Sequence, residues 1–146
     1  MKASILFCLM ISMIILGCAP KKSTPIEGAW HVVSWEQMAG DSLISKFTRD
    51  YTGSEMKIWS KNHELFVGRY KTDTTFHDTC GGGTYKLDGN RYEESFLYFP
   101  DQKIVGTTQR LLLEIKNDTL IQTWPVDKNW LVVKSKYNIQ KLTRLE

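Results

Sequence analysis

Short runs rich in apolar and β-branched residues alternate along the chain with turn-forming residues, and no long segment shows the 3.6-residue period of an amphipathic helix. Eight such runs follow one another from residue 28 onward, and we predict one strand for each. They span 28–36, 55–60, 63–70, 84–87, 91–99, 107–116, 119–124 and 130–142. Because most links between them have hairpin length, the pattern predicts an all-β, eight-stranded antiparallel up-and-down β-barrel, whose closure removes the sheet edges.

The strand pattern does not by itself decide the architecture, because an open two-sheet sandwich fits the same succession of strands. The longest irregular connection, 37–52, contains scattered apolar residues and is expected to form a short helix or a lid over a barrel mouth. The segment 71–83 is expected to be a polar loop that leads into the fourth strand, whose hairpin turn at Asp88-Gly89-Asn90 suits residues that accept a positive φ.

The N-terminal segment has the features of a secretory leader. Lys2 precedes an apolar run from Ile5 to Leu16, which is long enough for a signal peptide but short for a membrane span. The run ends in Ile15-Leu16-Gly17-Cys18, which resembles the lipobox of bacterial lipoproteins. That resemblance implies a signal peptide over 1–17, a lipidated Cys18 with a tether over 18–25, and a folded domain over 26–146. An ordinary signal peptide that is cut near Gly17 to Ala19 is the alternative.

Composition excludes some classes of partner. The chain has 19 Lys and Arg against 16 Asp and Glu, and these charges are interspersed, so we expect no nucleic-acid partner. Of the 3 cysteines, only Cys80 lies in the predicted domain, so an internal disulfide is not expected. Stability must then come from packing.

Several short motifs resemble those of one family. Gly28-Ala29-Trp30 resembles the first motif of lipocalins, and 66–70, 82–90 and 92–94 resemble strands of small lipocalin-like (calycin-type) bacterial lipoproteins. The resemblance implies that Gly28 and Trp30 lie at the barrel floor and that Arg144 or Lys141 stacks on Trp30. It also implies a lipid-anchored protein of the cell envelope, with the outer membrane as the expected location.

An eight-stranded barrel has room for side chains or for one small ligand. The candidates for a cavity lining are aromatic, with Arg69 and Gln122 as polar anchors. They are Trp59, Phe66, Arg69, Tyr70, Tyr85, Phe96, Tyr98, Gln122 and Trp124. The same aromatic side chains are also suited to filling the barrel as its core. Glu94 shares one strand face with Tyr92 and Phe96, and the pattern does not decide which face is the interior.

The segment His77-Asp78-Thr79-Cys80 contains side-chain types that bind metals. A complete site would need His63 or His31 as well. Alternatively, His77 is a candidate base for a nucleophilic Cys80, with amides of Gly81 to Gly83 as oxyanion donors. We expect neither a metal nor a cofactor, and the simpler interpretation is a polar loop.

The sequence therefore favours a non-enzymatic binding protein that holds a small, largely apolar ligand in the barrel. A barrel that is filled by its own side chains and binds an envelope protein or glycan is the alternative. An enzyme or metal site at His77 and Cys80 is the third hypothesis.

Overall fold

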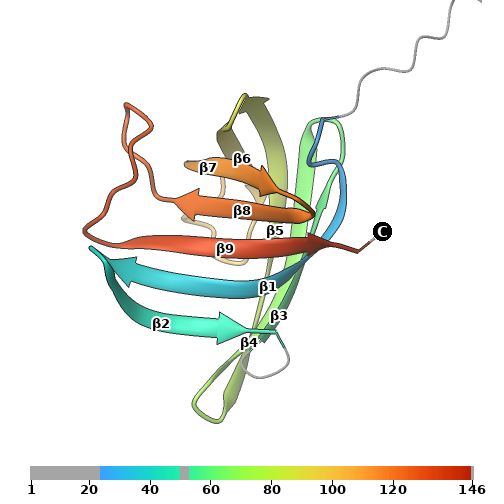
Figure 1. The fold of residues 1–146 in the computed structure, drawn as a ribbon. Coiled ribbons are helices and arrows are strands. Elements are labelled where there is room, and N and C mark those ends of the chain that lie inside the picture. The colour runs from blue at the N-terminus through green and yellow to red at the C-terminus, as the bar shows by residue number, and fades with distance from the viewer. Residues whose placement is uncertain (1–23, 50–52, 146) are drawn as a thin grey trace, which may run out of the picture.

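A computed structural model describes residues 24–49 and 53–145 as a strongly curved sheet that closes on itself (Figure 1). The predicted signal peptide, Cys18 and most of the tether lie outside these residues. The described chain forms nine strands, which are β1 (Gly28–Ala39), β2 (Ser42–Thr48), β3 (Gly53–Trp59), β4 (His63–Thr72), β5 (Thr75–Asp88), β6 (Arg91–Tyr98), β7 (Thr108–Lys116), β8 (Thr119–Trp124) and β9 (Tyr137–Arg144).

Strand β1 closes the barrel. One of its edges pairs with β9 along nearly its whole length, from Trp30 opposite Arg144 to Met38 opposite Tyr137. The other edge pairs with β3 through 28–31 and then with β2 through 34–39. The closed, eight-stranded antiparallel barrel that the sequence predicts is therefore confirmed, with β2 as an additional strand. The open sandwich is wrong, because the β1–β9 ladder joins the two ends of the sheet.

The irregular connection predicted over 37–52 is wrong for 37–49, and 50–52 lie outside the described residues. Strand β1 continues to Ala39, the chain reverses at Gly40, whose φ of 58° suits glycine, and β2 returns along β1. Most of the side chains of β2 are exposed, so backbone pairing with β1 forms this strand without the buried apolar face that sequence periodicity detects.

Two other predicted boundaries are also wrong. Strand β5 begins at Thr75, nine residues before the predicted start at Thr84, because 75–83 pairs with β4 although 75–78 is exposed on both faces. Strand β9 begins at Tyr137, whereas Trp130 belongs to a loop. In that loop, Asp127 Oδ1 accepts hydrogen bonds from the amides of Asn129 and Leu131 at 2.8 and 2.9 Å, which holds 127–131 in a turn.

Trp30 forms the floor of the barrel and is only 2% exposed. Its indole Nε1 donates a hydrogen bond to the carbonyl of Ile26 at 2.8 Å. The guanidinium of Arg144 lies 4.3 Å from the Trp30 ring centroid and donates to the carbonyls of Glu27 and Pro25. A Cβ at Gly28, where φ is 119°, would approach Arg144 Nη1 to 2.9 Å, so glycine leaves room for the cation. The structure thus places Arg144 over Trp30, while Lys141 lies three residues earlier on β9, opposite Ser34.

Candidate functional site

The half of the barrel next to the Trp30 floor is filled by its own side chains. Trp59 is buried and donates from Nε1 to the Tyr92 hydroxyl at 2.9 Å, and the rings of Tyr92 and Tyr85 stack with centroids 5.3 Å apart. Tyr85 also donates to the carbonyl of Ser60 at 2.7 Å. Burial of these rings together with leucines stabilises the fold. Trp59 and Tyr85, which the sequence offered as cavity residues, therefore lie in the hydrophobic core.

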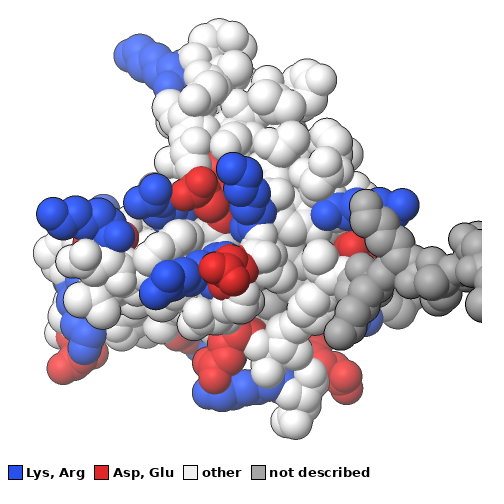
Figure 2. Space-filling model, turned by 90° about the horizontal axis from the view of Figure 1, so that it is seen from above, with Lys and Arg blue, Asp and Glu red and all other residues white. Residues whose placement is uncertain are grey.

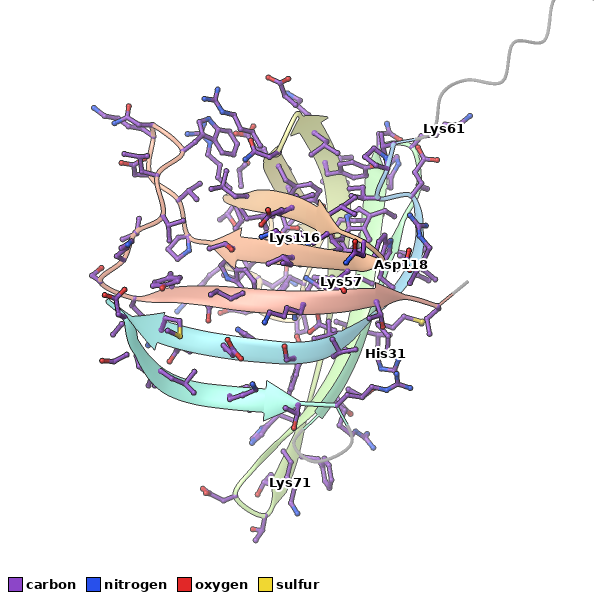
Figure 3. All side chains as sticks on the ribbon, in the orientation of Figure 1. His31, Lys57, Lys61, Lys71, Lys116 and Asp118 are labelled. Carbon is purple, nitrogen blue, oxygen red and sulfur yellow. The ribbon has the colours of Figure 1, made fainter. Side chains whose placement is uncertain are left out.

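A layer of polar side chains crosses the middle of the barrel. Figure 3 labels Lys57, which points inward from β3. Its Nζ donates to Gln122 Oε1 at 3.0 Å and lies 3.4 Å from Glu55 Oε1. Glu55 also accepts hydrogen bonds from Gln140 and from the hydroxyl of Tyr70. Tyr70 and Gln122, two of the predicted lining residues, are thus members of this layer.

The carboxyl groups of Glu64 and Glu94 face each other in the same layer. Glu64 is 1% exposed, and neither of its carboxylate oxygens has a hydrogen-bond partner of normal geometry. Burial, and then repulsion from Glu64, raise the pKa of Glu94 to about 8, so that this carboxyl is protonated at neutral pH. Burial also raises the pKa of Glu64.

Lys57 remains charged in this environment. Its burial acts to lower its pKa, but the surrounding carboxyl groups of Glu55, Glu94 and Glu64 outweigh burial and raise the pKa above the ordinary lysine value. A buried ammonium group beside several carboxyl groups is stabilised because each charge partly compensates the cost of burying the other. In the middle of the core, the charge of Lys57 is thus compensated by the carboxyl groups around it.

Aromatic rings cover the polar layer on the side of the barrel where β1 ends. The ring centroid of Trp35 lies 5.4 Å from that of Tyr70, 5.7 Å from that of Phe47 and 5.9 Å from that of Trp124. The indole of Trp35 also donates to Asn138 Oδ1 at 3.0 Å. These rings close much of the open end, which we define as the end formed by the β4–β5, β6–β7 and β8–β9 connections.

A hollow remains at the open end beside these rings. It has a volume of about 600 Å³ and lies where β7 and β8 separate, because their pairing stops at Leu112 opposite Thr123. We call it the mouth hollow. Phe96, Phe99, Ile104, Trp124, Pro125 and Val126 form its apolar part, and Thr107, Thr108, Gln109 and Arg110 form its polar part. Of the predicted lining residues, Phe96 and Trp124 lie here.

A second hollow lies on the outer surface of β3, β4 and β5. We call it the outer trough, and its volume is about 480 Å³. It is lined by uncharged residues, namely Met56, Ile58, Leu65, Phe66, Val67, Cys80, Gly81, Tyr98, Phe99 and Pro100. Phe99 lines both hollows and contacts the rings of Phe66 and Phe96 at centroid distances of 6.2 and 5.7 Å.

Two of the predicted lining residues face away from the interior. Arg69 forms a bidentate ion pair with Asp78 on the exposed surface, with its Nη2 2.8 Å from Asp78 Oδ2. Tyr98 is 68% exposed and borders the outer trough. Phe66 also borders the trough. The predicted set therefore divides among the core, the polar layer, the mouth hollow and the outer surface.

The predicted His77 and Cys80 pair does not converge. The two residues are three positions apart on β5, so their side chains lie on opposite faces of the strand, unsuited to a base and its nucleophile. His63 Nδ1 is hydrogen-bonded to Asn62, and His31 Nε2 to Ser54. Within 24–49 and 53–145, no three His, Cys, Asp or Glu side chains are grouped as metal ligands would be.

Phe99 and the charged residues of the polar layer are not among the predicted site residues. Phe99 was placed at the end of a strand, and only its contact with Phe66 reveals that it divides two hollows. Glu55, Lys57 and Trp59 follow one another at every second position of β3, so their spacing indicates a shared face, whereas Glu64 lies on β4 beside consecutive apolar residues. Charged residues are usually exposed, so this spacing alone does not assign the face to the interior.

Charges on the surface are mixed. Figure 2 shows one face of the molecule, on which Lys and Arg side chains lie next to Asp and Glu and leave wide uncharged areas between them. No helix long and apolar enough to cross a membrane is found in the part of the chain that the structure describes. No protein-family model matches the sequence, and no curated protein matches it.

Proposed function

We propose that this protein is a lipid-anchored, lipocalin-like binding protein of the cell envelope that holds a small amphiphilic ligand in the mouth hollow. The observation that carries the proposal is the hollow itself, which has a volume of about 600 Å³ at the open end of a barrel that is otherwise filled. Sites for small molecules commonly have volumes of 300–1,000 Å³ and combine apolar walls with a few polar groups.

The lining of the mouth hollow favours an amphiphilic ligand over the largely apolar one expected from the sequence. Aromatic rings of Phe96, Phe99 and Trp124 offer flat apolar contacts, while Thr107 and Gln109 offer hydrogen bonds. Arg110 is held by Glu93 at 2.7 Å and stacks on Trp130, so its charge is already compensated. A neutral polar group on an apolar body fits this environment.

The location in the envelope rests on the sequence. The apolar run from Ile5 to Leu16 and the following Cys18 resemble a lipoprotein leader, and Gly28 and Trp30 resemble the first lipocalin motif. The closed barrel supports the lipocalin-like interpretation. The proposal includes no catalytic step and no cofactor.

Binding is tested first with the uncharged fluorophore N-phenyl-1-naphthylamine, which has an apolar body and one N–H group. We expect saturable enhancement of its fluorescence with the full chain in lipid nanodiscs, after subtraction of empty nanodiscs. Val126→Trp, which introduces an indole into the hollow, is expected to weaken binding at least tenfold.

Val133→Trp is the matched control, because Val133 lies in the same connection but does not line the mouth hollow. Equal affinity in both variants would place the fluorophore elsewhere and contradict the proposal. Native mass spectrometry of the gently purified protein provides a second test. An added mass that denaturing extraction removes, and that Val126→Trp lacks, identifies the natural ligand.

A further inference from the structure

The hairpin of β4 and β5 extends beyond the wall of the barrel. The two strands pair from His63 opposite Thr84 to Thr72 opposite Thr75. The other edge of β5 pairs with β6 only from Gly82 onward. In the described part of the chain, the stretch 75–81 therefore pairs with β4 alone, and Figures 1 and 3 show the projecting hairpin, with Lys71 near its tip.

Exposure confirms that the first residues of β5 lie outside the core, although β4 still pairs with β3 up to Tyr70 opposite Gly53. Phe76, His77 and Asp78 are consecutive residues, so their side chains point to alternating faces, and all three are exposed. A strand of the barrel wall would bury every second side chain. Among the described residues, no strand pairs with one edge of 75–81, so its backbone N–H and C=O groups can pair with another strand.

Sequence explains why the edge is open. The β5–β6 ladder reaches Gly82 opposite Tyr98, where β6 ends, and two residues later comes Pro100, which would lie opposite Cys80. Proline has no amide hydrogen and cannot continue the ladder. The chain leaves the sheet there, and no strand within 24–49 and 53–145 takes the place of β6 beside 75–80.

The open edge lies next to the outer trough. Cys80 and Gly81 belong to both, and Tyr98 and Pro100 form the wall opposite Leu65 and Val67. Leu65 is 55% exposed and Val67 is 54% exposed. A contiguous set of exposed apolar side chains at the surface of a soluble domain commonly marks a contact with another molecule.

We propose that an extended strand of another protein adds to the open edge of β5 at 75–80 and places apolar side chains in the outer trough. The occupant follows from the two features together. A row of alternating amide donors and carbonyl acceptors is matched by a polypeptide strand, whereas a lipid or a small apolar molecule leaves these groups unpaired. This inference is independent of the ligand in the mouth hollow.

The faces of β5 specify the pattern of the added strand. Side chains of the added strand that point to the outer face meet Cys80 and the trough. Its side chains on the other face lie beside Thr75, His77 and Thr79. We therefore infer a segment of about seven residues in which apolar and polar residues alternate, with a length of roughly 20–24 Å.

The probe is a displayed library of random nine-residue peptides, selected on the full chain in lipid nanodiscs. We expect enrichment of peptides with an alternating apolar and polar pattern. Leu65→Lys is expected to weaken their binding at least tenfold, because it places a charge in the trough. Leu131→Lys is the matched control, since Leu131 is 65% exposed and lies outside the trough, and binding should be unchanged.

Strand addition is separated from general apolar adhesion by two synthetic forms of one enriched peptide, N-methylated at its odd or at its even residues. Successive backbone amides of a strand point to opposite edges, so one form should lose binding and the other should keep it. The backbone amides of 75–80 that point away from β4 should also become protected from hydrogen exchange when the unmethylated peptide binds.

Three results would overturn the proposal. The first is a library that enriches no peptide. The second is an enriched peptide that binds the Leu65→Lys variant as tightly as the wild-type protein, or that keeps its binding in both N-methylated forms. The third is a dimer of this protein, detected by sedimentation, or adhesion to phosphatidylglycerol vesicles that Leu65→Lys abolishes. In that case a second copy or a membrane surface occupies the trough.

Discussion

Glu94 offers the most informative single substitution, because its carboxyl is buried beside Glu64 in the middle of the barrel. The folded protein holds the Glu94 proton more tightly than the unfolded chain does, since the pKa is about 8 when folded and 4.5 as a free side chain. Below pH 4.5 both states are protonated, and above pH 8 both are ionised. Between these limits, the free energy of unfolding must fall as the pH rises.

The size of this effect follows from the two pKa values. Each pH unit within the window costs about 1.4 kcal/mol, so the stability that the proton on Glu94 provides decreases by roughly 5 kcal/mol between pH 4.5 and 8. Glu64 acts in the same direction, because its pKa is also raised. Domains of this size are commonly stable by only about 5–15 kcal/mol, so the loss is readily measurable.

Glu94→Gln replaces the carboxyl by an amide of similar size that cannot ionise. We expect the variant to lose most of the pH dependence and to gain several kcal/mol relative to the wild-type protein as the pH rises from 5 to 8. The assay is urea unfolding at pH 5, 6, 7 and 8, followed by tryptophan fluorescence. Glu93→Gln is the control, because Glu93 pairs with Arg110 on the outer surface, and it should keep the wild-type slope. An unchanged slope in Glu94→Gln would refute the reasoning.

Two further substitutions test the packing of the barrel. Trp30→Ala removes the floor and the partner of Arg144, and it should lower the free energy of unfolding by about 3–5 kcal/mol in urea titrations; a change below 1 kcal/mol would contradict that role. Gly83→Ala should lower the melting temperature, because a Cβ there would approach the carbonyl oxygen of Ser95 to 1.9 Å and force β5 and β6 apart. An unchanged melting temperature would show that this ladder adapts without cost.

The closed barrel could be predicted because each wall strand carries a local signal. Strand β7, for example, alternates buried Leu111 and Leu113 with more exposed neighbours, and turn residues separate it from β8. Strand β2 and the first part of β5 lack such a signal. These segments form strands because a neighbouring strand offers backbone hydrogen-bond partners. Their own side-chain pattern does not indicate this pairing.

The candidate sites were harder to predict for a different reason. Lys57 is accommodated inside the barrel because the amide of Gln122 and the carboxyl groups of Glu55, Glu64 and Glu94 converge on it from separate strands. A single charged residue in a strand indicates an outward face, and only the closed fold reveals the compensation. Phe96 and Trp124 were identified as lining candidates from their type, but the hollow beside them depends on where β7 and β8 separate.

The described chain begins at Thr24, whose hydroxyl lies 3.1 Å from that of Tyr85, at the end of the barrel opposite the mouth hollow. If Cys18 carries the proposed lipid, the segment from Cys18 to Thr24 holds this end within roughly 20 Å of the bilayer. Strand β1 has 12 residues, and strands in such barrels tilt by about 40°, so with the barrel axis normal to the bilayer the mouth lies roughly 30 Å further away. A ligand would then be received from the aqueous space or from a facing protein, out of reach of the headgroups to which the protein is anchored.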